Sequence, residues 1–238
     1  MDVPARDPVR VEAMFTGIAP AYDVTNDVLS FGMHRWWKRV LVKRAGDVRG
    51  QRILDAATGT GDLAFRFHER AGADGKVVGA DLSPGMLQAA AARAARIGVR
   101  GIEWHQADVT QLPFEDESFD LSMISFGIRN VTDPVAGLRE LGRVTRRGGR
   151  VLVLEFGSPE RRGIFTALSR FYITQLLPIV GGWLSGAGEA YRYLQKTVDT
   201  FPGGSAFASI IESTGNLGEV RYREFPGSFV YLYEARRQ

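Results

Sequence analysis

The sequence predicts an α/β fold built on a doubly wound, mainly parallel sheet. Short apolar runs alternate with helical patterns between residues 51 and 157, and a glycine-rich turn follows the first run within "ILDAATGTGDLAFRF" (53–67). Two closing runs stand on either side of Pro226-Gly227. Alternating strands and helices are typical of a parallel sheet covered on both faces, whereas the closing pair predicts an antiparallel hairpin.

Five short apolar runs predict the strands of the parallel part. They are "QRILDAA" (51–57), "KVVGADL" (76–82), "IEWHQADV" (102–109), "FDLSMISFG" (119–127) and "RVLVLEFG" (150–157). The closing hairpin is predicted from "LGEVRYREFP" (217–226) and "SFVYLYEARR" (228–237).

Helical patterns separate these strands. The run "PGMLQAAAARAARIG" (84–98) opens with proline and is rich in alanine, and both features favour a helix. Residues 62–72 predict a helix after the glycine-rich turn, and residues 133–149 predict one that ends at a Gly-Gly pair. Residues 8–45 are helix-rich as well, so we expect helices ahead of the first strand.

Length and composition restrict the class of protein. A chain of 238 residues fits one domain with a sizeable core, and its 45% hydrophobic residues are ordinary for a soluble protein. The absence of cysteine excludes disulfides and thiol catalysis, and the three scattered histidines do not suggest a zinc site. The N-terminus "MDVPARDPVR" lacks the apolar core of a signal peptide, so we expect a cytoplasmic protein. A formal charge of +3 is too small to indicate a partner.

One apolar segment, residues 164–187, raises the question of a membrane span. Arg170, Gln175, Pro178 and a glycine pair interrupt it. A buried or interfacial helix therefore fits this segment better than a spanning one.

Acidic residues recur at the ends of three successive predicted strands, as Asp55, Asp81 and Asp108. Ligands of open α/β sheets bind beyond the carboxyl ends of the strands, so these acids fall where a ligand is expected. Aspartate also favours turns and helix caps, which is the ordinary structural explanation for each of them.

The glycine-rich turn has two interpretations. Gly59, Gly61 and Ala64 satisfy the G-x-G-x-x-G/A pattern of a dinucleotide site, which supports a nicotinamide-dependent oxidoreductase. Asp55 and Asp62 flank the turn, however, and two carboxylates there repel a diphosphate but tolerate an ammonium group. S-adenosylmethionine, which combines an amino-acid end, a ribose and an adenine, fits this pattern better.

Residues 51–156 resemble the class I S-adenosylmethionine-dependent methyltransferases, whose first motif stands here as "LDAATGTGD". The resemblance implies their Rossmann-like fold, with S-adenosylmethionine as the cofactor. It places the second acid, in "GADLS", on the ribose and "ADV" around the adenine. The cofactor-binding residues that it implies are Asp55, Gly59, Thr60, Gly61, Asp81, Asp108, Val109 and Ser125.

Three further motifs resemble the UbiE/MenG family of quinone-biosynthesis C-methyltransferases. They are "FTGIAPAYDVTNDVLSFGMHRWWKR" (15–39), "SFGIRNVTD" (125–133) and "EAYRYLQKTV" (189–198). The resemblance implies methylation of a ring carbon of a polyprenyl hydroquinone. Demethylmenaquinol is the expected substrate, and a methoxy-polyprenyl-benzoquinol of ubiquinone synthesis is the alternative.

The same resemblance implies one methyltransferase domain with four parts. They are an N-terminal helical cap (1–50), a cofactor-binding core (51–156), a helical substrate lid (157–204) and a C-terminal helix and hairpin (205–238). A long isoprenoid tail requires an apolar lip, for which residues 164–187 are the candidate. Arg161, Arg162 and Arg170 would then meet lipid headgroups, which implies peripheral contact with the inner face of the cell membrane. A homodimer is left open.

Ring-carbon methylation requires a bound phenol that loses its proton in a water-excluded site. Arg129 and Asn130 follow the fourth predicted strand, where we expect Arg129 to partner a phenolate and Asn130 to orient it. A structural ion pair is the alternative for Arg129. Tyr22 and Asp23 are candidates to cap the cofactor or relay a proton, or else they serve packing and helix capping. His34 has a suitable intrinsic pKa for a base, but its motif also fits simple helix docking.

Two other functions compete with this interpretation. A methyltransferase of nucleic acid or protein is disfavoured, because the sequence shows no basic stripe interleaved with aromatic residues and no Asn-Pro-Pro-Tyr-like motif after the fourth strand. A non-catalytic cofactor-binding module would leave Arg129 and Asn130 without a role. We therefore expect no nucleic-acid partner and no metal.

Overall fold

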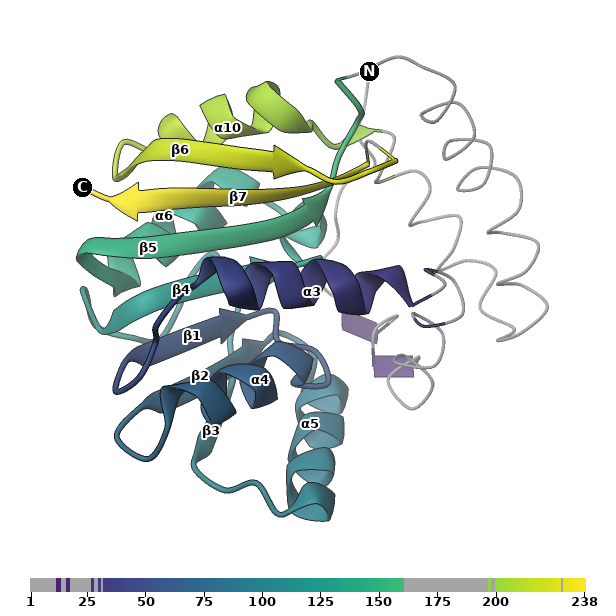
Figure 1. Ribbon diagram of the computed structural model, residues 1–238, viewed down its shortest axis with the longest axis vertical. Helices are drawn as coiled ribbons and strands as arrows, with labels where there is room; N and C mark the ends of the chain where they lie inside the picture. Colours follow the sequence, from purple (N-terminus) through teal and green to yellow (C-terminus); the bar gives the residue numbers. More distant parts are fainter. Residues whose placement is uncertain are drawn as a thin grey trace.

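The structure is a computed structural model that describes residues 12–13, 16–17, 27, 30, 32–160, 197, 200–227 and 229–238. In this part of the chain, seven strands form one sheet with the order β3-β2-β1-β4-β5-β7-β6 (Figure 1). The strands are β1 (Arg52–Ala56), β2 (Lys76–Asp81), β3 (Ile102–Gln106), β4 (Phe119–Ser125), β5 (Thr145–Phe156), β6 (Leu217–Glu224) and β7 (Val230–Arg237). The helices are α3 (Met33–Arg44), α4 (Asp62–Ala71), α5 (Pro84–Ile97), the short 3-10 helix η2 (Ile128–Asn130), α6 (Pro134–Val144) and α10 (Gly204–Glu212).

The sheet is parallel apart from β7. β1 pairs in parallel with β2 and β4, β2 pairs with β3, and β4 pairs with β5. β7 runs antiparallel to both β5 and β6. The predicted mainly parallel sheet and its closing hairpin are therefore confirmed.

Helices cover both faces of the sheet. α3 and α4 bury Trp37 and Phe67 in an apolar cluster on one face, and α6 and α10 bury Leu141 and Phe207 on the other. Figure 1 shows α3 and α4 in front of the sheet and α6 and α10 behind it. Each fully buried side chain of this size contributes about 1.5–3 kcal/mol, so these two layers hold the central strands in place.

Capping residues fix where two of the helices begin. The Ser83 Oγ accepts a hydrogen bond from the Met86 amide at 3.2 Å, and Pro84 starts α5. Asp133 does the same for α6, because its Oδ1 accepts from the amides of Val135 and Ala136, both at 3.0 Å. Such caps satisfy amides that have no partner within the helix, and they place both helix starts directly after a strand or turn at the carboxyl edge.

The helix predicted over 133–149 is wrong at its C-terminal end. α6 ends at Val144, and β5 begins at Thr145, which pairs with Phe119 of β4. The buried Thr145 hydroxyl donates to the Leu141 carbonyl at 2.6 Å, and its oxygen lies 2.7 Å from the Ser122 hydroxyl, with which it shares a second hydrogen bond. Thr145 therefore links the end of the helix to the sheet. The glycine pair that suggested a helix stop instead lies within β5, where the register with β4 shifts.

The strand order reverses between β1 and β4, and this switch point is where ligands bind in open α/β sheets. The described residues include no helix long and apolar enough to cross a membrane. The predicted apolar segment 164–187 lies outside them, and so does the motif 189–198 apart from Thr197. The division into cap, core, lid and hairpin therefore stays a prediction, although residues 51–156 do contain β1 to β5.

Candidate active site

A cleft lies at the carboxyl ends of the central strands. It has about 750 Å³ of empty space, part of it open to solvent. Its lining comes from the turn after β1, the end of β2, the segments after β3 and β4, and the start of α5. Of the predicted site residues, those that line it are Gly59, Asp81, Asp108, Val109, Ser125 and Asn130.

The turn after β1 has a backbone that few residues adopt. Gly59 and Gly61 have φ values of 58° and 82°, and Ala57 also has a positive φ of 52°. A Cβ on Gly61 would lie 2.8 Å from the Trp104 ring and 3.0 Å from the Phe65 ring. Glycine is therefore required at position 61 both by the backbone and by the space available.

Asp81 ties this turn to the end of β2. Its Oδ2 accepts a hydrogen bond from the Gly59 amide at 2.8 Å, and its Oδ1 accepts from the Ser83 amide at 2.9 Å. Burial raises the pKa of the Asp81 carboxyl, and the bonds from these amides act against that rise. A carboxylate has about four acceptor positions, so Asp81 keeps acceptor capacity for ligand hydroxyls in the cleft.

Asp55 was expected to bind the cofactor, but it is not among the residues that line the cleft. Asp55 is 2% exposed, and its carboxylate accepts a hydrogen bond from the Thr58 hydroxyl at 2.7 Å, so it supports the turn from the buried side. Burial raises the pKa of Asp55 to about 7, against the Thr58 hydrogen bond and the charge of Lys38.

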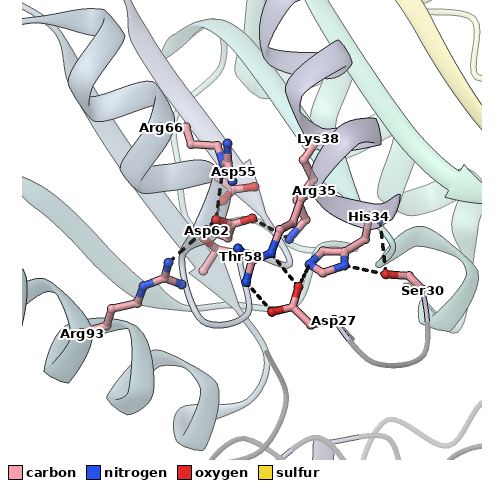
Figure 2. Close-up of polar contacts among 10 residues, drawn as sticks. All are labelled: Asp27, Ser30, His34, Arg35, Lys38, Asp55, Thr58, Asp62, Arg66 and Arg93. Atoms are coloured by element: carbon pink, nitrogen blue, oxygen red, sulfur yellow. Dashed lines mark hydrogen bonds and ion pairs between the residues drawn. The ribbon is translucent and has the colours of Figure 1, made fainter. Parts of the chain in front are cut away.

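Asp62, at the first residue of α4, is surrounded by cations (Figure 2). Its carboxylate lies 3.1 Å from Lys38 Nζ, 3.3 Å from Arg66 Nε and 3.9 Å from Arg93. Burial acts to raise the pKa of Asp62, but these charges outweigh it and hold the pKa below its usual value. The carboxylates that flank the turn are thus either buried with a raised pKa or neutralised, and the expected repulsion of a diphosphate is weaker than the sequence suggested.

The segment after β3 contributes a polar and an apolar side chain. The Asp108 Oδ1 accepts from both the amide and the hydroxyl of Thr110 at 2.8 Å, which fixes the carboxylate at the cleft. Val109 is 6% exposed and belongs to the apolar cluster on the α6 face. Thr60, by contrast, is buried and is not among the residues that line the cleft.

Two buried polar atoms in the cleft have no hydrogen-bond partner within the described part of the chain. They are the Ser125 Oγ at the end of β4 and the Asn130 Oδ1 on η2. Leaving a buried polar atom unsatisfied costs about 1–3 kcal/mol. Their position in one cleft is therefore typical of a site completed by a polar ligand.

Arg129 lies beside the cleft in a buried ion pair. Its Nη1 donates to Glu155 Oε1 and to the Phe126 carbonyl, both at 2.7 Å, and its amide donates to Glu155 Oε2 at 3.2 Å. The guanidinium also stacks over the Phe156 ring at 5.4 Å. This ion pair is the structural role that the sequence offered as the alternative for Arg129. The pair holds in place the turn that carries Phe126 and Asn130.

His34 lies on α3 and is not among the residues that line the cleft (Figure 2). Its Nδ1 is 2.7 Å from the Ser30 hydroxyl, and its Nε2 is 3.6 Å from Asp27 Oδ1. Burial and the charge of Lys38 lower the pKa of His34, which favours the neutral ring. Tyr22 and Asp23 lie outside the described residues, and their predicted roles stay predictions.

Comparison with known proteins decides the family of the chain. The model of the ubiE/COQ5 methyltransferase family matches residues 5–236. The chain belongs to the ubiE/COQ5 methyltransferase family. It is therefore an S-adenosylmethionine-dependent methyltransferase, as the resemblance of its motifs implied.

Similar proteins cover nearly the whole length. A relative from Bdellovibrio bacteriovorus, named ubiquinone/menaquinone biosynthesis C-methyltransferase UbiE, is 44% identical over 228 residues, which are 96% of each chain. A relative of the same name from Idiomarina loihiensis is 39% identical over 224 residues, covering 94% of this chain and 88% of the relative. A solved S-adenosylmethionine-dependent methyltransferase from Aquifex aeolicus has a TM-score of 0.61 at 18% identity over 84% of this chain and 89% of its own, which shows the shared fold.

The cleft of this ubiE/COQ5 family member fits its cofactor. Gly59 lines the cleft without a side chain, the Asp81 carboxylate has free acceptor positions, and Ser125 and Asn130 offer unsatisfied polar atoms. The apolar side of the cleft comes from Val109 and neighbouring residues, which suits a flat base.

The sequence analysis assigned no role to several residues that organise this site, although Phe126 and Glu155 lie at strand ends where a ligand is expected. Glu155 and Lys38 supply its ion pairs, and Phe126 lines the cleft with a positive φ of 56°. Glu155 stands at the end of the fifth predicted strand, an acid where a buried strand meets the carboxyl edge, and that position was a signal for it. Lys38 lies in a basic helix, where nothing in the sequence distinguishes it from its neighbours.

Proposed function

We propose that this enzyme methylates a ring carbon of a polyprenyl hydroquinone in menaquinone or ubiquinone biosynthesis, with demethylmenaquinol as the first choice of substrate. The observation that supports this most is the 44% identity, over 96% of both chains, to a relative named for quinone-biosynthesis C-methylation. Methylation of a methoxy-polyprenyl-benzoquinol is the second candidate, because the name of that relative covers both pathways.

The proposal assigns cofactor contacts to the residues of the cleft. Asp81 would accept hydrogen bonds from the ribose hydroxyls, Asp108 and Val109 would hold the adenine, and Gly59 would allow close approach of the backbone. S-adenosylmethionine, when bound, supplies an electrophilic methyl group on a sulfonium. Asp55, Thr60 and Gly61 would act indirectly in this scheme, by holding the turn in shape.

The chemistry at the substrate consists of two proton movements. The hydroxyl must lose its proton so that the ring carbon becomes nucleophilic, and the ring carbon must lose its own proton after it has gained the methyl group. We assign Asn130 to the substrate oxygen, since this residue lines the cleft and its carboxamide oxygen has no partner in the described part of the chain. Arg129, expected from the sequence to partner the phenolate, is instead assigned here as a positioning residue, because its ion pair with Glu155 holds the turn that carries Asn130.

The candidates for the proton acceptor are Tyr22, Asp23 and His34. His34 suits this role chemically because burial lowers its pKa and favours the neutral ring. Its hydrogen bond with Ser30 and its contact with Asp27 fix the ring orientation. A general base contributes about 10²–10⁴-fold to such a reaction, so His34→Gln is expected to reduce kcat by that factor if His34 is the base.

The proposal includes a cytoplasmic enzyme that meets the inner face of the cell membrane peripherally. Polyprenyl tails partition into bilayers, so the substrate has to be reached at a lipid surface. Residues 164–187 were predicted to form the apolar lip, and that assignment stays a prediction.

A strain that lacks the gene tests the function directly. Its extracted lipids are expected to accumulate demethylmenaquinone, and complementation with the wild-type gene should restore menaquinone. Accumulation of a methoxy-polyprenyl-benzoquinone precursor would move the assignment to the second candidate. An unchanged quinone profile would contradict the proposal.

A further inference from the structure

Residues of α3 and β6 form an exposed cationic face. We call it the α3–β6 face and define it by Trp36, Arg39 and Lys43 of α3 and by Arg221 and Arg223 of β6. The three α3 residues follow an i, i+3, i+7 spacing and so share one stripe of the helix, and the two β6 residues lie two apart on one side of the strand. All five are exposed, and Trp36 is 39% exposed.

Contacts at both ends of α3 align the helix with the hairpin. At one end the rings of Trp36 and Phe225, which follows β6, lie 5.2 Å apart in an edge-to-face arrangement. At the other end Arg44 Nε donates to Glu234 Oε2 of β7 at 2.6 Å, and Glu234 is the partner of Arg221 in the β6–β7 ladder. Figure 1 shows α3 in front of the sheet, and no described helix lies in front of β6 and β7.

The charges of this face are not neutralised within the described part of the chain. Arg39, Lys43, Arg221 and Arg223 make no ion pair with another described residue, and Arg223 stacks over the Phe225 ring at 5.5 Å. Three neighbouring arginines are paired instead, Arg44 and Arg150 with Glu234 and Arg236 with Glu219. Four unpaired cations on one exposed face are complementary to an anionic surface.

An aromatic path leads from this face to the cleft. The Trp37 ring lies 6.3 Å from Phe225 and 6.0 Å from Phe126, and Phe126 lines the cleft. These packed rings connect the exposed face to a residue that lines the cleft. Tryptophan is favoured at the boundary between water and lipid, because its large ring has a polar edge.

We propose that the α3–β6 face is the surface by which this enzyme docks onto an anionic phospholipid bilayer, with Trp36 in the headgroup region and the four cations against lipid phosphates. The inference rests on the proposed function, because only a membrane-embedded substrate gives the enzyme a reason to dock. It assigns the membrane contact to α3 and β6, a different part of the chain from residues 164–187.

Flotation with vesicles tests the docking surface. The full-length enzyme is expected to float with phosphatidylcholine vesicles that contain a quarter phosphatidylglycerol, and to release them in high salt. Each basic residue near such a surface contributes about five-fold to binding, so the pair Arg39→Gln/Lys43→Gln should weaken partitioning about 30-fold. The matched control Arg96→Gln/Arg100→Gln removes the same charge from exposed sites near α5 and should change it less than two-fold.

A second measurement tests the orientation of the bound enzyme. Vesicles with brominated acyl chains should quench the tryptophan fluorescence of the wild type, and Trp36→Phe should lose most of this quenching. Calorimetric titration with S-adenosylmethionine checks that each variant is folded.

Several results would overturn the docking proposal. One is that the wild type does not float with the vesicles, and another is that the control pair loses as much vesicle binding as Arg39→Gln/Lys43→Gln. A third is that the enzyme does not bind vesicles but binds a single-stranded oligonucleotide through Arg39 and Lys43. The proposed function is tested apart from docking, by turnover of a short-tailed, water-soluble quinol by the wild type. Flotation without turnover would refute the function, whereas turnover without flotation would refute only the docking face.

Discussion

The ion pair between Arg129 and Glu155 allows the sharpest prediction for this enzyme. The two side chains are 7% and 1% exposed, and the guanidinium is the only described cation paired with Glu155. Arg129→Met keeps the length and apolar character of the side chain but leaves the carboxylate buried without a counter-charge. Breaking a buried pair in this way costs about 3–5 kcal/mol.

That loss is large enough to measure in two ways. At about 2–4 °C per kcal/mol for a chain of this size, the melting temperature should fall by about 6–20 °C. Urea unfolding followed by circular dichroism gives the free energy itself. The double variant Arg129→Met/Glu155→Gln removes the uncompensated charge as well, so it should be more stable than Arg129→Met alone.

The comparison of single and double variants separates structure from catalysis. If Arg129 only met the substrate, Arg129→Met would lose activity and keep its stability. A free energy of unfolding within about 1 kcal/mol of the wild type would refute the positioning role through Glu155.

Substitutions at four other residues of this site have predicted effects. Burial raises the pKa of Asp55 from 3.8 in the unfolded chain to about 7, so the free energy of unfolding should fall by about 4 kcal/mol as pH rises from about 4 to about 7. Asp55→Asn should remove most of this fall, which is measured by comparing unfolding at pH 5 and pH 8. Gly61→Ala should lower stability by at least about 1–2 kcal/mol through its positive φ and its contact with Trp104, and an unchanged melting temperature would argue against the strain. Ser125→Ala removes an unsatisfied hydroxyl, so the ligand-free protein should be as stable as the wild type or more stable, while calorimetry shows weaker cofactor binding; a loss of stability would mean that the hydroxyl has a partner. Asp81→Asn should weaken S-adenosylmethionine binding by about 10–100-fold, because hydrogen bonds to a charged group contribute about 1.5–3 kcal/mol, and equal affinity would remove Asp81 from the site.

Much of the fold was predictable because its signals are local. The period of the apolar residues predicted the strands, and an opening proline in an alanine-rich run predicted the start of α5. The end of α6 was not predictable in the same way, because Thr145 stops the helix through a buried bond to Ser122 on another strand. A tertiary contact therefore overrode the local helical pattern.

The site was predictable where the motif itself touches the cleft. Asp81, Asp108 and Ser125 lie at strand ends, and the parallel topology brings those ends to one edge. The electrostatics were less predictable, because the charge of Asp62 depends on Lys38, Arg66 and Arg93 from three helices.

The α3–β6 face shows the same limit for surfaces. The α3 half of this face, with Trp36 and its basic neighbours, and the β6 half, with Arg221 and Arg223, are far apart in the sequence. Only the packing of α3 beside the hairpin brings the two sets of cations together.

The central claim is that the cleft at the carboxyl ends of β1 to β4 delivers a methyl group to a quinol carbon. The most direct test incubates the wild type with S-adenosylmethionine that has a deuterated methyl group and with demethylmenaquinol, and follows the product by mass and NMR. The account predicts one deuterated methyl group on a ring carbon. A label on oxygen, or no transfer while the protein binds NAD in its place, would contradict it.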